Sequence, residues 1–223
     1  MVENIPAEIK RLADEYERWA REGDITGHRP CSAEGCDCRF RHRHGWLTRA
    51  LVCGGWECRI ALLRLCCPKC GATEVLAPEW LRPHSPYPWP WQEAAALHYV
   101  GSPLGYRPVA ALFGVDYTVL WGWVARLAAS AVDLVGEVVR ELLGQEPGAP
   151  LELVPVAHGA VLRKARTPGK RQGLAHLPLL AQGAAALRAA CRRRAGMPDA
   201  DQTALGALGW LGRYLAVHRG PAA

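Results

Sequence analysis

The sequence predicts an α+β protein that is mostly helical, with a small β zinc ribbon followed by a helix-turn-helix and a helical C-terminal region. Three observations support this prediction. Eight of the nine cysteines fall between Cys31 and Cys70, in a stretch without helical periodicity. From Trp91 onward, apolar residues recur at helical spacing. A glycine lies between two of these helical segments, where a helix-turn-helix would turn.

The chain of 223 residues has room for one or two small domains, and half of its residues are hydrophobic, so it can bury a core. Its first residues are charged and lack the apolar segment of a signal peptide. The longest apolar run is interrupted by Arg126, Asp133 and Glu137, which disfavours a membrane span. We therefore expect a cytoplasmic protein without a membrane partner, in which clustered thiols stay reduced and bind metal.

Residues 1–24 are expected to form an amphipathic N-terminal helix. Pro6 suits its first turn, and Gly23 suits its end. The apolar residues of this segment fall on one face at helical spacing: Ile9, Leu12, Ala13, Tyr16, Trp19 and Ala20.

Residues 28–77 carry the cysteine spacing of a zinc ribbon and are expected to form short strands and tight turns. The motif Cys67-Pro68-Lys69-Cys70-Gly71 lets two sulfurs converge on one metal, because the proline presets the turn and the glycine permits a left-handed backbone. Cys31 and Cys36, separated by four residues, supply the second pair. We predict that one Zn²⁺ is bound in a closed, structural site by Cys31, Cys36, Cys67 and Cys70.

The remaining cysteines of this segment leave alternatives open. Cys38 is the substitute ligand if the first knuckle is drawn differently, but only one residue separates it from Cys36, which makes convergence on one ion awkward. Cys53, Cys58 and Cys66 are expected to be small buried hydrophobic residues. A second metal site formed by Cys53, Cys58 and a histidine is the alternative.

A basic segment, Arg39–Arg49, follows the first cysteine pair, and the net charge of +6 makes the whole chain mildly basic. Basic blocks of this kind suit a phosphate backbone, or they simply keep a protein soluble. His42 and His44 alternate with arginines, so on a strand the two imidazoles would share one face. We favour contact with phosphate as their role, and metal ligation is the alternative.

A segment dense in proline and tryptophan, residues 78–91, is expected to form an extended connector, because proline removes backbone donors and fixes φ.

Residues 92–144 then predict a helix-turn-helix with a long third helix. The apolar seam of that helix, from Leu120 to Val138, would pack against the C-terminal helices or permit homodimerisation. Residues 145–223 follow as a helical C-terminal region. Two helices are expected there: 178–195 and 201–218.

The stretch Tyr106–Leu127 has the pattern of a helix-turn-helix. Ala110 supplies the small residue where the two helices cross, and Gly114 supplies the turn, where φ is often positive. Apolar residues flank the turn and form a buried stripe on the second helix: Phe113, Val115, Leu120 and Trp123. The outward positions of the second helix are Asp116, Tyr117, Thr118, Trp121, Gly122 and Arg126. Only Arg126 is of a type that commonly reads base edges. Either the contacts are mostly to the DNA backbone, with modest sequence preference, or the helix pair forms a protein-binding surface.

Five segments between Cys31 and Leu127 occur in this order: CSAEGC, RHGW, CPKCG, LAPEWLRPHSPYP and YRPVAALFGVDYTVLWGWV. In this order they resemble a bacterial family of zinc-ribbon and helix-turn-helix proteins, which is similar to the DNA-binding N-terminal half of insertion-sequence transposases. The resemblance implies DNA binding, and it implies that Cys36 is the first-knuckle cysteine nearer RHGW. The four-residue gap between Cys31 and Cys36 departs from the usual two-residue gap of the family.

The sequence does not predict a catalytic half. After Gly144 the acidic residues are few, and the region is too short for the sheet-based core on which a transposase holds two metal ions. The sequence also lacks the motifs of a zinc deaminase, and it has neither a Walker A loop nor a nucleophile elbow. We therefore expect a protein that is not an enzyme.

The sequence thus favours a zinc-dependent protein that binds double-stranded DNA, either transposase-derived or regulatory. A protein-protein interaction or assembly module, built on the same ribbon and helices, is the alternative. The residues expected at the DNA are Arg39, Arg41, His42, Arg43, His44, Tyr117, Thr118, Trp121 and Arg126. The first five of these would contact phosphates.

Overall fold

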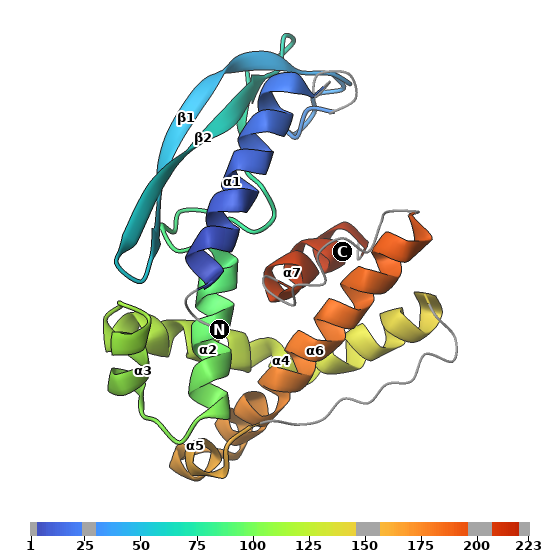
Figure 1. Cartoon of the computed structure of the whole chain (residues 1–223). Helices are drawn as coiled ribbons and strands as arrows, with labels where there is room; N and C mark the ends of the chain where they lie inside the picture. The colour runs from blue at the N-terminus through green and yellow to red at the C-terminus, as the bar shows by residue number, and fades with distance from the viewer. Residues whose placement is uncertain (1–3, 24–29, 146–156, 196–206, 219–223) are drawn as a thin grey trace. The chain divides into compact units, whose positions relative to one another are not determined.

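The computed structural model describes residues 4–23, 30–145, 157–195 and 207–218. Within these residues the chain forms seven helices and a three-stranded antiparallel sheet, so the predicted fold class is confirmed (Figure 1). The chain divides into two compact units, residues 3–88 and residues 89–223. The sheet belongs to the first unit and six of the helices belong to the second.

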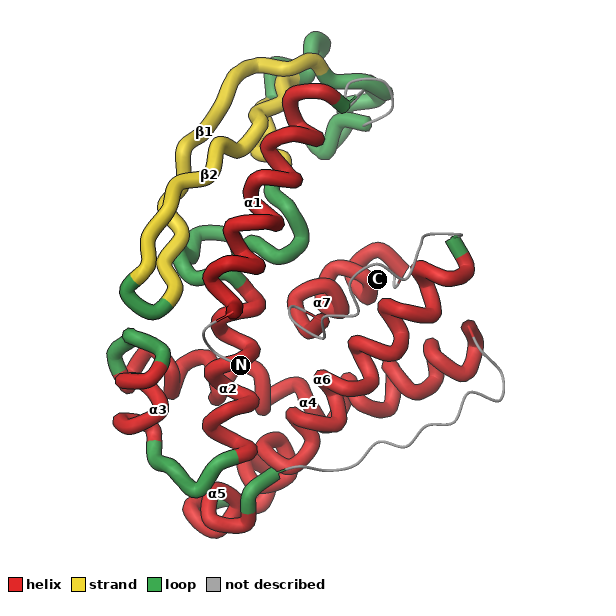
Figure 2. The backbone as a smooth tube through the Cα atoms, viewed as in Figure 1, coloured by secondary structure: helices red, strands yellow, loops and turns green. Residues whose placement is uncertain are grey.

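The first unit contains one helix and all three strands. Helix α1 spans Ile5–Glu22, β1 spans His42–Cys53, β2 spans Trp56–Cys66 and β3 spans Thr73–Leu76. The strands follow one another in the sheet in chain order, and both pairs are antiparallel (Figure 2). The four-residue β3 therefore lies beside β2, at the end of the hairpin where the cysteine loops are found.

The β1–β2 hairpin is longer than the short strands that the sequence suggested. Its strands have twelve and eleven residues, and they pair from His42–Cys66 to Cys53–Trp56. Gly54 and Gly55 form the two-residue loop with φ of 54° and 82°. Two successive positive φ values match a tight hairpin turn whose twist agrees with that of the strands, and glycine adopts them without steric cost. This Gly-Gly pair is the local signal for the long hairpin.

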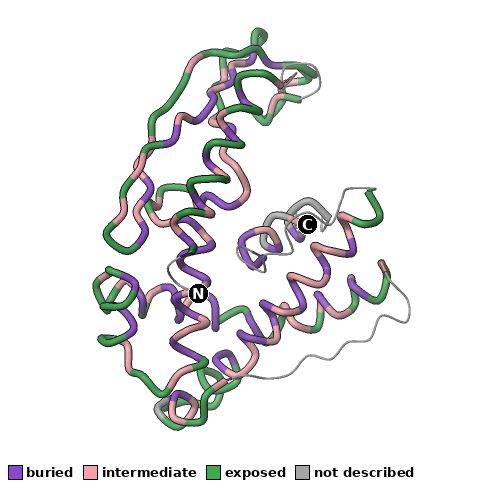
Figure 3. The backbone as a smooth tube through the Cα atoms, in the orientation of Figure 1, coloured by how far each residue is buried: buried purple, intermediate pink, exposed green. Residues whose placement is uncertain are grey.

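Helix α1 packs along the hairpin through the apolar stripe expected from the sequence (Figure 3). Its buried residues are Ile5, Ile9, Ala13, Tyr16 and Ala20. The Tyr16 hydroxyl donates a hydrogen bond to the Leu76 carbonyl and accepts one from the Leu63 backbone N–H (3.0 Å). One side chain thereby links α1 to both β2 and β3. Trp19, expected on the same face, is half exposed.

The proline-rich segment after β3 packs on the hairpin within the first unit. The Arg49 guanidinium donates to the carbonyls of Arg82 (2.6 Å) and Ser85 (2.7 Å). The Val52 backbone N–H donates to the Pro86 carbonyl (2.9 Å). A segment poor in backbone donors is thus held by donors that the hairpin supplies.

The second unit is helical. Its elements are α2 (Trp89–Gly101), α3 (Tyr106–Leu112), α4 (Tyr117–Gln145), α5 (Gly159–Lys164), α6 (Pro168–Arg194) and α7 (Ala207–His218). Helices α2, α3 and α4 contact one another, and the seam of α4 packs against α6 (Figure 1). Packing against a C-terminal helix is one of the two uses that the sequence left open for this seam. Among the described residues, α4 is the one helix that is long and apolar enough to cross a membrane. In its most apolar stretch of 18 residues, 33% is buried within the structure.

Helix α6 begins earlier than the sequence suggested. It starts at Pro168 rather than Pro178, because the Thr167 hydroxyl caps it by accepting from the Lys170 backbone N–H (3.3 Å). Pro178 lies inside the helix and not in its first turn. The other expected helix is α7, and its expected start at residue 201 lies outside the described residues.

Small residues let α6 approach α4 closely. A Cβ atom added at Gly173 would lie 2.3 Å from the Ala128 carbonyl oxygen, and one at Gly183 would lie 2.8 Å from the Val138 side chain. Both glycines are buried. The closeness of the two helices therefore depends on the absence of these side-chain atoms.

We predict that Gly173→Ala destabilises the second unit by about 1–3 kcal/mol, because the added methyl group meets backbone that cannot move without opening the α4–α6 packing. Urea unfolding monitored by circular dichroism measures the change. The matched control is Gly136→Ala on the exposed side of α4, where an added Cβ meets nothing within 4 Å. This control should be neutral, or stabilising by up to about 1 kcal/mol. Equal stability of the two variants would contradict the prediction.

Candidate metal centre

Two loops bring four cysteine sulfurs to one place in the first unit. Cys31 and Cys36 lie in the loop between α1 and β1, and Cys67 and Cys70 lie in the loop between β2 and β3. All four Sγ atoms lie within 4.8 Å of one another. The Cys31–Cys70 sulfurs are 3.6 Å apart and the Cys36–Cys67 sulfurs are 3.7 Å apart. Each of these close pairs joins one loop to the other.

These distances fit a single tetrahedral zinc ion. Zinc–sulfur bonds of about 2.3 Å in a tetrahedron place neighbouring sulfurs about 3.8 Å apart. Four thiolates around one ion leave no open position, which is the pattern of structural zinc sites rather than catalytic ones. The first unit is therefore consistent with a zinc-ribbon-like module, in which a three-stranded sheet carries a four-cysteine cluster that could hold zinc.

Backbone hydrogen bonds shape both loops. In the second loop the Cys67 backbone N–H donates to the Ala72 carbonyl (2.9 Å), and the Gly71 N–H donates to the Cys67 carbonyl (3.0 Å). Gly71 has a φ of 74°, which a residue with a side chain rarely adopts. In the first loop Gly35 plays the same role, with a φ of 72° immediately before Cys36. The longer spacing of the first pair is thus accommodated by its own left-handed glycine.

Two thiols of the cluster, Cys67 and Cys36, have pKa values shifted in opposite directions. The backbone N–H of Cys70, followed by that of Lys69, donates toward the Cys67 sulfur and lowers the pKa of Cys67 to about 6. The backbone N–H of Cys38 favours the Cys36 thiolate, but loss of hydration and the neighbouring thiols outweigh it and raise the pKa of Cys36 to about 12. Four thiolates at this distance repel one another, so a divalent cation is needed to hold them all ionised.

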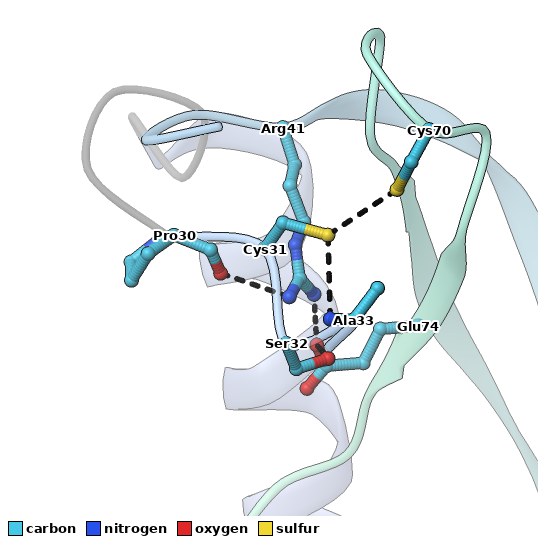
Figure 4. A network of polar contacts seen from close by, with 7 residues as sticks. All are labelled: Pro30, Cys31, Ser32, Ala33, Arg41, Cys70 and Glu74. Carbon is cyan, nitrogen blue, oxygen red and sulfur yellow. Dashed lines mark hydrogen bonds and ion pairs between the residues drawn. The ribbon is translucent and has the colours of Figure 1, made fainter. Parts of the chain in front are cut away.

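A buried arginine fastens the first loop to β3 (Figure 4). The Arg41 guanidinium donates to the Pro30 carbonyl (2.8 Å), next to Cys31, and forms an ion pair with Glu74. Ser32 also donates to Glu74 (3.4 Å). The Arg41 side chain is only 4% exposed. Arg41 was expected to contact phosphate, and we assign it instead to positioning the loop that carries the first two ligands.

The other basic residues expected at phosphates lie on the surface. Arg39, His42 and His44 are exposed, and their contact with DNA stays a prediction. Arg43 is also exposed, and its guanidinium donates to the carbonyls of Arg21 (3.0 Å) and Gly23 (2.7 Å) at the end of α1. It thereby satisfies carbonyls that a helix C-terminus leaves without partners.

The remaining cysteines of the first unit lie outside the four-sulfur cluster. Cys38 donates to the Phe40 carbonyl (3.1 Å), which argues against its use as the substitute ligand. Cys53 is fully buried, and desolvation raises its pKa to about 12, as expected for a small core residue. Cys58 and Cys66 are half-buried. Within the described residues Cys53 and Cys58 do not gather with a histidine, so the alternative metal site formed by these two cysteines is not present there.

The second unit contains a helix pair with the expected turn. Ala110 and Phe113 are buried between α2, α3 and α4, and Gly114 has a φ of 58°. Asp116 precedes α4 and accepts from the Thr118 backbone N–H (2.8 Å) and hydroxyl. These two hydrogen bonds stabilise the carboxylate and lower the pKa of Asp116. They also fix the start of α4.

The first turns of α4 expose two aromatic rings beside a basic residue. Tyr117 is 44% and Trp121 is 52% exposed, and the Arg107 guanidinium lies 5.3 Å from the centre of the Tyr117 ring. Arg107 is exposed on α3, and the sequence does not predict it at the DNA. Arg126 is predicted at the DNA, but it is partly buried and donates to the Gln92 side chain of α2 (3.0 Å).

Comparisons of this chain with protein-family models, with curated proteins and with solved structures give no match. The cysteine geometry therefore carries the assignment of a metal site, and the resemblance to insertion-sequence transposases remains an expectation from the sequence.

We predict that Cys36→Ala abolishes the four-thiolate centre, because three sulfurs no longer close the tetrahedron. Titration of the metal-free chain with Co²⁺ measures this, since absorption from sulfur-to-cobalt charge transfer reports the number of bound thiolates. Cys38→Ala is the matched control, because it removes a neighbouring thiol from outside the cluster. The account fails if Cys38→Ala loses the four-thiolate spectrum and Cys36→Ala keeps it.

We further predict that Arg41→Met weakens zinc binding by about tenfold, because residues that position metal ligands typically contribute 10–100-fold to affinity. Competition with a chromophoric chelator measures the affinity. Arg39→Met, which changes an exposed arginine two residues away, should leave it unchanged. Similar affinities for the two variants would show that the Arg41–Glu74 pair does not hold the loop.

Proposed function

We propose that this protein binds double-stranded DNA through its helix-turn-helix, and that a structural zinc ion holds its ribbon folded. The observation that carries the proposal is the surface formed by Arg107, Tyr117, Thr118 and Trp121, which we call the α3–α4 face. Arg107 is exposed on α3, and the other three residues are exposed in the first turns of α4, the second helix of the pair. In a helix-turn-helix this is the part that enters the major groove.

The chemistry of the α3–α4 face suits the DNA backbone better than base edges. Arg107 supplies a cation for phosphate, and the Tyr117 ring lies against its guanidinium. Thr118 hydrogen-bonds to Asp116, and Trp121 offers an apolar surface to sugars or thymine methyl groups. We therefore expect affinity with modest sequence preference.

The zinc ion has a structural role in this proposal. A closed four-thiolate site offers no position for water or substrate, so the metal supplies folding free energy and no reaction chemistry. The ribbon would add phosphate contacts through exposed residues such as Arg39. We propose no enzymatic activity.

A mobility-shift titration with a random-sequence duplex at increasing salt tests the proposal. We expect log affinity to fall linearly with log salt, and Arg107→Met to reduce the slope by about one, as for the loss of one phosphate contact. Arg140→Met is the matched control, because Arg140 is exposed near the other end of α4. Absence of binding at low salt would contradict the proposal, as would an equal effect of the two variants.

A second candidate function is protein assembly, which the exposed apolar residues of the same region favour. Leu112 is 55% exposed, close to the value for Trp121. An assembly surface would act without nucleic acid. Light scattering of the DNA-free chain distinguishes the two functions: self-association that Trp121→Ala abolishes would favour assembly, and a monomer that binds duplex would favour DNA binding.

A further inference from the structure

A second group of metal-ligating side chains lies on the β1–β2 hairpin. One ring nitrogen of His42, one ring nitrogen of His44 and the Cys66 sulfur all lie within 4.8 Å of one another. None of the three belongs to the four-cysteine cluster. Both histidines are exposed and Cys66 is half-buried, so solvent and metal ions can reach the group.

The sheet register brings these three residues together. His42 pairs directly with Cys66 across the antiparallel strands, and side chains of such pairs lie side by side. The register shifts between Arg43 and Gly45, so His44 is the extra residue of a β-bulge. Gly45 has a φ of 153°, which residues with a side chain rarely adopt. A bulge changes the direction of a side chain, and here the His44 ring lies beside the His42–Cys66 pair.

The neighbouring residues leave His42, His44 and Cys66 available as metal ligands. Cys66 is the last residue of β2, and its sulfur belongs to this group and not to the four-sulfur cluster that the next residue, Cys67, helps to form. Arg43, between the two histidines, is held by carbonyls at the end of α1. Its charge is therefore directed toward that helix terminus. The Cys66 thiol donates to the carbonyls of Cys67 (3.6 Å) and Gly71 (3.7 Å), at distances of weak contacts.

We propose that His42, His44 and Cys66 form a second zinc site, with one coordination position open. Two imidazoles and one thiolate are a ligand set that suits Zn²⁺. On binding, Cys66 loses its thiol proton to solvent and forms a zinc–sulfur bond, and each histidine donates a ring-nitrogen lone pair. Three protein ligands leave the fourth position to water or another small ligand.

The two sites differ in charge and access. One thiolate and two neutral imidazoles leave a net positive charge on the second site, whereas four thiolates leave a net negative charge on the first. The second site can therefore attract an anionic ligand, and the first cannot. This inference does not rest on the proposed DNA binding. It assigns His42 and His44 to metal ligation instead of the phosphate contact expected from the sequence.

Titration of the full-length, reduced, metal-free chain with Co²⁺ tests the second site. We expect two equivalents to bind. The first should produce the four-thiolate spectrum, and the second should add the weaker sulfur charge-transfer absorption of a single thiolate. His44→Ala and Cys66→Ser should each bind one equivalent and keep the four-thiolate spectrum, which also reports that the ribbon is folded.

Two control variants change residues of the same kinds outside both clusters. Cys58→Ser replaces another half-buried thiol of β2, and His84→Asn replaces an exposed histidine whose φ of 56° asparagine tolerates. Both should bind two equivalents. The proposal is overturned if the wild-type chain binds one equivalent. It is also overturned if the second equivalent survives in both His44→Ala and Cys66→Ser, or disappears equally in the controls.

Discussion

Contact between the two cysteine loops is the constraint on which the first unit depends. Cys31–Cys36 and Cys67–Cys70 belong to distant parts of the chain, and β3 has only four residues to hold the second loop in the sheet. Two ion pairs also link the loops: the buried Arg41 pairs with Glu74, and the exposed Lys69 pairs with Asp37. They cannot offset repulsion among four ionised thiols, so a cation bound by the cluster would decide whether the loops stay together.

The two units obtain their stability in different ways. The first has one helix, and this helix is fastened to the sheet by an apolar stripe and by the Tyr16 hydroxyl. A unit of this size buries limited apolar surface, which is the circumstance in which proteins use structural metals. The second unit buries a continuous core between α4 and α6, where Gly173 and Gly183 permit close approach. Metal binding and the helix-turn-helix can therefore be altered separately by mutation.

Local chemistry made part of this structure predictable from the sequence. The Cys-x-x-Cys-Gly motif identified the second loop, because a turn that brings two sulfurs together needs only these neighbouring residues and a left-handed glycine. The helical spacing of the apolar residues identified the buried face of α1. The positive φ of Gly114 followed in the same way. Features that depend on tertiary packing were missed: the burial of Arg41, the helical position of Pro178 and the meeting of His44 with Cys66. The last needs a β-bulge and a strand register, and no short motif specifies either.

X-ray absorption at the zinc edge tests the central claim most directly. The Cys66→Ser chain, loaded with one equivalent of zinc, isolates the four-cysteine centre from the second cluster. The account predicts a single shell of four sulfur atoms at about 2.3 Å from zinc. A shell with fewer sulfurs, completed by nitrogen or oxygen, would contradict it, because the two loops would then not share one closed metal ion.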